Sequence, residues 1–339
     1  MASELLRVLI VGCGNMAGGY DLRQPEDAPP LGHAKAFAKH GGFSLAACVE
    51  PDEERRRAFQ ERWHVQTGFK SLKDMAQGAG HFDVISICSP TSTHANDLQT
   101  ALKMSPRLVF CEKPVTSSFQ ETQRLVQAFA DQKVLLAVNY SRRWSPEVVQ
   151  LKTDLSNGDW GAVRSVSAVY NKGLLNNGSH MIDLLLYLFG PLRLTGVGHG
   201  VNDFFTDDPT IDATLLTGQG FPVQLNVAHA KDYAVFEMQI VTERGAISME
   251  DGGARWRLRR AEDSTQLPGY RFLNQGEWIQ AKGSLALSRA VKNIFGALQS
   301  GEVLSSTGSS ALQAQALCEQ IKKMAQAQPA GQTQTGAVL

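Results

Sequence analysis

The chain has 339 residues, and its 33 lysine and arginine residues balance 33 aspartate and glutamate residues, so the formal net charge is zero. This length predicts two domains, and the charge balance gives no sign of a nucleic-acid or acidic-membrane partner. We find no signal-peptide pattern and no apolar run near the roughly 18 residues of a membrane span, so we expect a cytoplasmic protein. The five cysteines lack metal-ligand spacing, which predicts no metal site.

The first 140 residues alternate strand and helix patterns. Short apolar runs, typical of strands buried on both faces, cover residues 7–11, 44–49, 83–88, 108–111 and 134–138. Helical spacing of apolar residues lies between these runs. The alternation predicts the α/β class, with a doubly wound parallel sheet over residues 1–140.

The first predicted strand runs directly into the sequence GCGNMA, residues 12–17. Gly12 permits a tight turn, Gly14 lets the backbone approach a pyrophosphate, and Ala17 is small enough for close packing of helix on strand. Amides at the start of the following helix would face the phosphates. The predicted cofactor-binding residues of this turn are Gly12, Gly14, Asn15, Met16 and Ala17.

Glu50 ends the second predicted strand. A carboxylate at this place accepts hydrogen bonds from both ribose hydroxyls and repels a 2′-phosphate, which favours NAD over NADP. The alternative is a solvated residue at a strand end. The arginines at 55–57 either weaken the preference for NAD, so that NADP stays possible, or line a solvated helix face.

The spacing of this unit is unusual, because Glu50 comes 33 positions after Ala17, whereas about 20 is typical. The excess lies in residues 18–32, which are rich in proline, aspartate and glycine. We predict an inserted loop beside the cofactor site. It is either a plain surface excursion, which we favour slightly, or a lid over the substrate.

Two further strand ends carry polar motifs. Lys113, in the sequence CEKP, follows a buried strand where parallel sheets hold their ligands, so its ammonium could polarise a substrate oxygen; the alternative is a surface charge. The sequence SPTSTH, residues 89–94, suits a loop over the nicotinamide ribose or simply caps the next helix. The predicted cofactor-binding residues here are Ser89, Pro90, Thr91, His94, Glu112 and Lys113.

The pattern changes after Tyr140 and predicts an α+β domain over residues 141–326. We expect helices over 146–155 and over NNGSHMIDLLLYLFG, the latter ended by Gly190 and Pro191. Strand patterns cover residues 163–170, 193–200, 211–217, 222–230, 235–242, 246–250 and 255–260, which predicts a large, mostly antiparallel open sheet. Apolar residues at helical spacing then predict further helices near the end of the chain. The polar tail that follows, residues 327–339, is predicted to be disordered.

The segment NNGSHMID brings together candidate catalytic residues. In a helix, Asn176 and His180 share one face, and Asp183 lies three residues further on. Histidine titrates near neutrality and can act as general acid or base; the alternative is a hydrogen-bonded core histidine. Asp183 either holds the imidazole or has a structural role, which we favour.

Other polar residues lie near the predicted domain junction. Tyr140, Arg142 and Arg143 follow the last strand of the first domain, and arginines there suit a phosphate or carboxylate. Lys172 ends a predicted strand and is a further candidate for substrate binding. We expect Trp144 and Trp256 to be packing residues.

Over about residues 6–325 the chain resembles the glucose–fructose oxidoreductase/inositol dehydrogenase/MocA (Gfo/Idh/MocA) family, because five motifs occur in the order seen in that family. They are the glycine turn, the acid that ends the second strand, SPTSTH, CEKP and GSHMIDLL. The resemblance implies a Rossmann domain and an α+β domain whose open sheet forms dimers or tetramers. It also implies reversible hydride transfer between a sugar or cyclitol carbon and a nicotinamide. Lys113 would be the catalytic lysine and His180 the general acid/base, and a cis bond would precede Pro114.

One residue departs from the family pattern. Many dehydrogenases of the family have aspartate four residues before the histidine, where this chain has Asn176. Asparagine can orient a neighbour by hydrogen bonding but cannot take a proton, and it suits a neutral hydroxyl or amide. This favours, weakly, an N-acetylated or nucleotide-linked sugar. The alternatives are a family member that recycles tightly bound NAD and a non-catalytic dinucleotide sensor.

Overall fold

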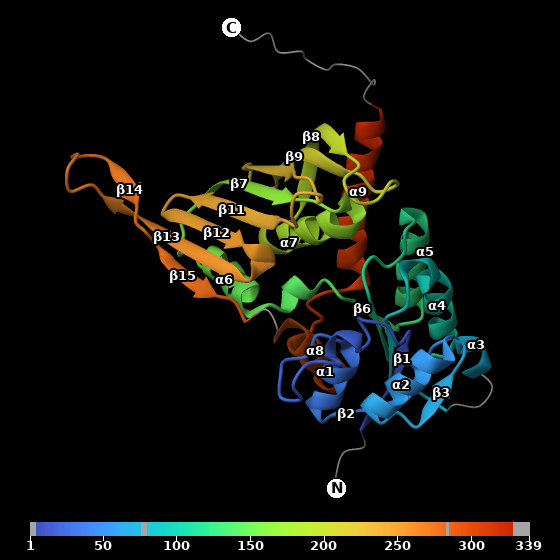
Figure 1. Cartoon of the computed structure of the whole chain (residues 1–339). Coiled ribbons are helices and arrows are strands. Elements are labelled where there is room, and N and C mark those ends of the chain that lie inside the picture. Colours follow the sequence, from blue (N-terminus) through green and yellow to red (C-terminus); the bar gives the residue numbers. More distant parts are fainter. Residues whose placement is uncertain (1–4, 76–79, 283–284, 328–339) are drawn as a thin grey trace. The chain divides into compact units, whose positions relative to one another are not determined.

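The computed structural model describes residues 5–75, 80–282 and 285–327 (Figure 1). They form two compact units. The first extends to Asn157 and includes Gln280–Gln315, and the second comprises Gly158–Ile279 and the residues from Ala316 onward. The division differs from the single boundary expected at residue 140. The predicted disorder of the tail falls almost entirely outside the described residues.

The first unit contains the predicted parallel sheet, with strand order β3-β2-β1-β4-β5-β6. The order reverses direction between β1 and β4, which is where doubly wound sheets bind their ligands. Its strands are β1 (Leu6–Val11), β2 (Phe43–Val49), β3 (Thr67–Phe69), β4 (Val84–Ile87), β5 (Leu108–Cys111) and β6 (Leu135–Val138). The sequence predicted all of these except β3.

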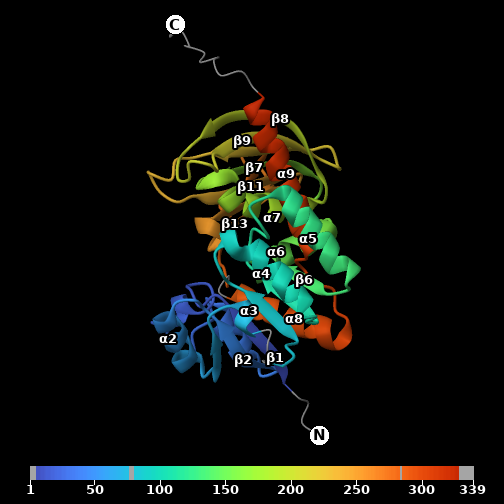
Figure 2. The same cartoon turned by 90° about the vertical axis from the view of Figure 1, so that its right-hand side faces the viewer.

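Helices surround this sheet, and α4 and α5 lie side by side (Figure 2). Two helices of this unit, α2 and α5, begin at side-chain caps: Asp52 accepts a hydrogen bond from the Arg55 amide, and Ser118 from the Glu121 amide. The helices of this unit are η1 (Gly19–Asp21), α1 (His33–His40), α2 (Glu53–Trp63), α3 (Leu72–Met75), α4 (Thr91–Lys103), α5 (Phe119–Asp131), η2 (Ser141–Trp144), α6 (Pro146–Ser156) and α8 (Ala286–Ser300).

The unusual spacing before Glu50 has a simple structural cause. In an uninterrupted α-helix the carbonyls of Met16 and Ala17 would accept from residues 20 and 21; here they accept from the amides of His33 and Ala34, at 2.9 and 2.8 Å. Thirteen residues are therefore looped out of one helix. Removing 13 from the spacing of 33 leaves the typical 20.

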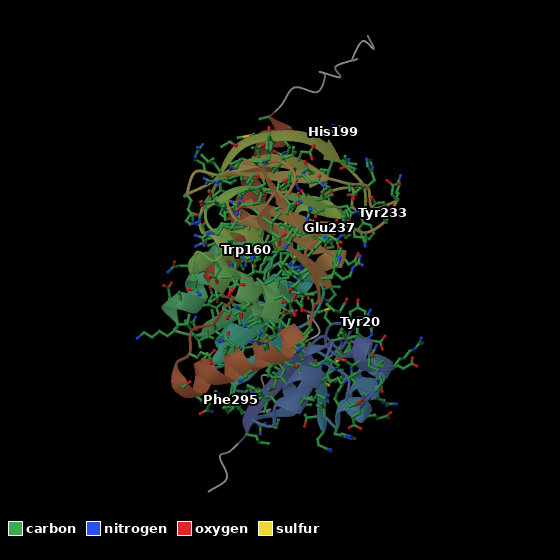
Figure 3. All side chains as sticks on the ribbon, turned by 90° about the vertical axis from the view of Figure 1, so that its left-hand side faces the viewer. Tyr20, Trp160, His199, Tyr233, Glu237 and Phe295 are labelled. Atoms are coloured by element: carbon green, nitrogen blue, oxygen red, sulfur yellow. The ribbon has the colours of Figure 1, made fainter. Side chains whose placement is uncertain are left out.

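The looped-out segment is fastened to the helix that it interrupts. The buried Asp21 carboxylate accepts from the amides of Leu31 and Gly32, at 2.9 and 2.7 Å. Lys35 donates to the Pro25 carbonyl at 2.8 Å. Tyr20, marked in Figure 3, is 52% exposed. These contacts are those of a fixed surface excursion.

Helix α8 explains why residues 280–315 belong to the first unit. Its apolar stripe packs into the same core as α1 and β1, and Phe295 (Figure 3) contacts the rings of His40 and Phe43. The Trp144 indole donates to Asn293 at 3.0 Å. The chain thus completes the core of this unit only after it has formed the second sheet.

The second unit is built on the predicted large sheet, with order β14-β13-β12-β11-β7-β10-β9-β8 and β15 paired to β13. The pairs are antiparallel except β7 with β10, and β13 and β14 extend as an arm (Figure 1). Its strands are β7 (Val163–Tyr170), β8 (Leu192–Val201), β9 (Thr210–Thr217), β10 (Pro222–Val227), β11 (Phe236–Thr242), β12 (Gly245–Glu250), β13 (Arg255–Asp263), β14 (Arg271–Leu273) and β15 (Glu277–Gln280).

The helical segments of the second unit are η3 (Gly173–Gly178), α7 (Ser179–Phe189) and η4 (Asp251–Gly253), and α9 (Gly308–Gln326) runs from one unit into the other. Across the described ranges, no helix has the length and apolar character needed to cross a bilayer. The same residues contain no group of three or more histidine, cysteine or acidic side chains placed to hold a metal ion.

Candidate active site

The glycine turn between β1 and the interrupted helix fits a dinucleotide phosphate. Gly12 has a φ of +83°, and a Cβ there would lie 2.7 Å from the Ser89 backbone, so another residue cannot replace it without a shift. At Gly14 an added Cβ would meet no described atom within 4 Å. The backbone at Gly14 therefore borders open space that a pyrophosphate can approach.

Glu50 is tied to this turn, because its Oε2 accepts a hydrogen bond from the Cys13 amide at 2.9 Å. Its Oε1 accepts from the Asp52 amide at 3.1 Å and lies 3.5 Å from the Arg55 guanidinium. Glu50 is buried, so it is not a solvated strand end. A carboxylate here can accept from ribose hydroxyls, and Arg55 beside it partly offsets its charge.

The loop after β4 uses its hydroxyls to hold helix α4. Ser89 and Thr93 both donate to the Asp97 carboxylate, at 2.6 and 2.8 Å, and Pro90 precedes the helix start at Thr91. His94 is buried and lies between two backbone carbonyls: Nδ1 is 2.9 Å from Pro114 O, and Nε2 is 2.9 Å from Ser89 O. The imidazole joins the two loops that the sequence assigned to the cofactor.

Lys113 follows β5 and is partly exposed, and its peptide bond to Pro114 is cis, as the resemblance implied. The preceding residue, Glu112, is buried. Its Oε1 lies 2.9 Å from His33 Nε2 and accepts a hydrogen bond from the Asn139 amide at 2.7 Å. The sequence analysis did not identify His33 or Asn139.

His33 is fully buried and contacts two strands of the sheet, β4 and β5. Its Nδ1 lies 2.8 Å from Ser86 Oγ, and its ring stacks on Phe110 at 4.5 Å. Burial lowers the pKa of His33, but Cys88 and the Glu112 carboxylate raise it, to about 10. Burial raises the pKa of Glu112, but the hydrogen bond from His33 outweighs it and holds that pKa below its ordinary value.

The segment NYSRRW lies at the end of β6. Tyr140 and Trp144 are buried, and the Arg143 guanidinium donates to the Ser305 carbonyl at 3.2 Å. Arg142 is partly exposed. The indole of Trp144 packs as expected, and so does that of Trp256 in the second unit.

In the second unit, the segment NNGSHMID is helical, but its first half is a π-helix, η3, that continues as α7. Gly178 allows this continuation, because a Cβ there would lie 2.6 Å from the Tyr170 ring. His180 is partly exposed in the first turn of α7, and Asp183 is buried. Helix α7 ends before Gly190, as predicted.

Two aspartates hold the start of η3. The Asp208 carboxylate accepts from the amides of Leu175 and Asn176, both at 2.8 Å. Asp203 accepts from the Lys172 amide at 2.8 Å. The Asn176 side chain donates to the Lys172 carbonyl at 2.9 Å. One short stretch of the second unit thus carries Lys172, Asn176, His180 and Asp183. Lys113 and the glycine turn belong to the first unit.

Residues 6–140 match the model of an oxidoreductase family with an NAD-binding Rossmann fold, the one that the motifs resemble. Residues 6–140 therefore resemble the NAD-binding domain of the Gfo/Idh/MocA family. The matched model is that of an NAD-binding domain, and the residues of the glycine turn and Glu50 fit that cofactor.

Known proteins extend the likeness over both units. The chain is 39% identical over 202 residues to the uncharacterized oxidoreductase YrbE of Bacillus subtilis, a match that covers 55% of this chain and 59% of that one. It is 22% identical to an inositol 2-dehydrogenase of Rhizobium meliloti, over 85% of this chain and 91% of the relative. The WlbA dehydrogenase of Bordetella pertussis, solved with NADH and UDP-GlcNAcA, shares the fold with a TM-score of 0.75, 19% identity and coverage of 96% and 97%.

Proposed function

We propose that this protein is an NAD(P)-dependent oxidoreductase of the Gfo/Idh/MocA family, acting on a secondary alcohol or ketone carbon of a sugar, a nucleotide-linked sugar or a cyclitol. The observation that carries the proposal is the position of Lys113. It follows β5 at the edge of the sheet where the glycine turn follows β1 and Glu50 follows β2. A cation at that edge is next to the place where a Rossmann sheet holds its ligand.

Each residue has a role that its chemistry supports. The Lys113 ammonium binds the reacting oxygen and stabilises negative charge that develops on it. His180 takes the hydroxyl proton in oxidation and returns it in reduction. A nicotinamide dinucleotide held at the glycine turn and Glu50 would supply the hydride chemistry. The Asn176 amide offers a donor and an acceptor to a neutral hydroxyl or N-acetyl group.

The substrate class is supported by the relatives, which include proteins named inositol 2-dehydrogenase and D-glucoside 3-dehydrogenase. The structural neighbour solved with UDP-GlcNAcA adds nucleotide-linked sugars to the set. We favour the nucleotide-linked sugars because Asn176 replaces the aspartate of many family dehydrogenases. The preference for NAD over NADP rests on the buried Glu50 carboxylate.

The test is a turnover assay that follows the absorbance of the reduced nicotinamide. The protein, first checked for nucleotide retained through purification, is offered NAD or NADP with free sugars, inositols and nucleotide-linked sugars. Turnover with one class that is lost in Lys113→Ala supports the proposal. Absence of turnover with retained dinucleotide would contradict it and favour recycled NAD or a sensor.

We also propose a homodimer or homotetramer that pairs through the open face of the second sheet. Polar side chains on that face, such as Gln239 of β11 and Ser167 of β7, are exposed and alternate with buried apolar neighbours. Light scattering of the purified protein tests the state. A monomer at micromolar concentration would contradict it.

A further inference from the structure

The residues on both sides of Lys113 are each held by a buried imidazole. Glu112, immediately before it, is in contact with His33, and Pro114, immediately after it, is in contact with His94. These histidines come from different helices, α1 and α4, and both are almost fully buried. We propose that His33, His94 and Asn139 are positioning residues that hold Lys113 in the geometry needed for catalysis. The inference rests on the proposed function, because it assigns Lys113 a role in turnover.

The Glu112 carboxylate is the first element of this arrangement. A single oxygen, Oε1, receives hydrogen bonds from His33 Nε2 at 2.9 Å and from Asn139 Nδ2 at 2.7 Å. Two donors on one oxygen favour the ionised form of a carboxyl group. The Glu112 amide also donates to the Ile87 carbonyl at 2.9 Å. Both the side chain and the backbone before Lys113 are therefore fixed to neighbouring strands.

Asn139 is retained at an energetic cost. Its side-chain Oδ1 is buried and has no hydrogen-bond partner in the part of the chain that the structure describes. A buried unpaired acceptor destabilises a fold, and a residue that served packing alone would avoid it. The NH₂ group of Asn139, in contrast, donates to Glu112 and lies 3.3 Å from His33. This points to a specific use for the amide as a donor to the carboxylate.

His94 is the second element. Its two ring nitrogens lie 2.9 Å from the carbonyls of Pro114 and Ser89. A neutral imidazole donates from one ring nitrogen, so its tautomer decides which of the two carbonyls accepts the hydrogen bond; in either tautomer the ring lies between the loop after β4 and the loop after β5. The backbone after Lys113 is thereby tied to the loop that the sequence placed over the nicotinamide.

The consequence for Lys113 has two parts. With both neighbours fixed, the lysine backbone cannot drift, and the ammonium samples a restricted volume. The Glu112 carboxylate also places a negative charge next to Lys113 in the chain. The groups that face His33 are Ser86 and Cys88 near β4, Glu112 at the end of β5 and Asn139 at the end of β6. All of them belong to the first unit, so residues of that unit determine the protonation of His33.

The experiment compares His33→Gln and His94→Gln with a matched control, His40→Gln. His40 lies on the same helix as His33, and its ring packs on Phe43 and Phe295. We expect kcat to fall about 10- to 100-fold in the first two variants. The dissociation constant for NADH should stay within about twofold, and the control should behave as wild type.

A second measurement needs no substrate. Trace acetylation with acetic anhydride, read by mass spectrometry, reports the fraction of each lysine present as neutral amine. Glu112→Gln should raise the labelling rate of Lys113 relative to that of Lys103 in the same molecule, because the neighbouring anion is gone. If a histidine variant does not fold, Asn139→Ala removes one donor and leaves the His33–Glu112 contact, and kcat should then fall about 3- to 10-fold.

The outcomes separate the two proposals. If Lys113→Ala abolishes turnover while both histidine variants keep kcat within twofold of the control, the positioning role is wrong. An unchanged Lys113 labelling rate in Glu112→Gln would also overturn it. If Lys113→Ala leaves turnover intact, Lys113 is not catalytic and the positioning role fails with it; if the wild-type protein turns over no substrate, the proposed function itself fails.

Discussion

The segments that carry Lys113 and His180 are held in different ways. Around Lys113, buried side chains from three distant parts of the chain contact one another, as His33, Glu112 and Asn139 do. Around Asn176 and His180, aspartates accept hydrogen bonds from backbone amides at the start of η3. The first arrangement depends on charge and protonation, and the second on local backbone geometry. The two segments should therefore respond differently to substitution and to pH.

The largest effect is expected for His180→Ala, which removes the proposed general acid/base. We expect kcat to fall about 10²- to 10⁴-fold, since proton transfer by a positioned side chain contributes that much. The dissociation constant for NADH should not change. His199→Ala is the matched control, because His199 is exposed on β8 (Figure 3). An equal loss in both variants would contradict a specific role for His180.

Next in size is the pH-dependent stability that comes from His33. Its pKa is raised from 6.5 to about 10, so its contribution to stability is complete below pH 6.5 and is lost as the pH rises towards 10. The pKa of Glu112 is lowered, so its contribution is lost on acidification. Breaking a buried pair costs about 3–5 kcal/mol. We expect His33→Gln to lower the free energy of unfolding most near pH 6 and less at pH 9.

Chemical denaturation across this pH range checks the result. The control His40→Gln should show the opposite slope, because burial and Lys292 lower the pKa of His40 and make its protonation unfavourable to folding at low pH. A His33→Gln difference that stays constant from pH 6 to pH 9 would show that folding does not raise the pKa of His33.

A smaller effect is expected at the cofactor turn. Glu50→Gln replaces the carboxylate that accepts from the Cys13 amide and is proposed to accept from the ribose. We expect the affinity for NADH to fall about 10- to 100-fold, the range for a hydrogen bond to a charged group. The affinity for NADPH should fall less, because the repulsion of its 2′-phosphate is removed. Fluorescence titration measures both.

Asp52→Asn is the control for this comparison, since asparagine also caps a helix well and Asp52 caps α2. If Glu50→Gln left the ratio of the two affinities unchanged, Glu50 would not set the cofactor preference.

In the second unit, Asp208→Asn tests whether the hydrogen bonds from the Leu175 and Asn176 amides to Asp208 fix the start of η3. One of its two acceptor oxygens becomes an NH₂ group that faces a backbone amide, so the start of η3 must shift. We expect kcat to fall about 10-fold, with little dependence on pH between 6 and 9, in contrast to the His33 variant. Asp207→Asn, at the exposed neighbouring position, should have no effect. Loss of activity in Asp207→Asn as well would indicate general damage to the loop.

The smallest effect is expected from deleting Gly19–Leu31. This removes the 13 looped-out residues and lets Gly18 run into Gly32, whose backbone atoms already lie close together. Because the helix is then continuous, we expect affinity for NADH within about twofold of wild type and little change in kcat. A large loss of kcat with intact NADH binding would mean that the segment is a lid.

The local pattern of polar and apolar residues predicted most of the helices and strands. It did not predict the side-chain contacts that hold the candidate site. Residues 163–170 alternate in polarity and form β7 as predicted, whereas β14 is three exposed residues without any pattern. Gly12, Glu50 and Lys113 could be predicted as site residues because each follows a predicted strand, and Gly12 also belongs to a glycine-rich turn. His33 had no local signal, because its partner Glu112 is 79 residues away. The π-helical form of η3 depends on Asp208 and Tyr170, which lie outside the segment.

The return of α8 to the first unit has a consequence for synthesis on the ribosome. The strands β1 to β6 emerge first, but the surface of α1 and β1 that α8 covers stays open until residues 286–300 have been made. At about 5–20 residues per second, translating the intervening second sheet takes on the order of ten seconds. During that interval Phe37 and Phe43 border an uncovered apolar face. Nascent chains paused before residue 286 should therefore bind a ribosome-associated chaperone, and those extended past residue 315 should release it.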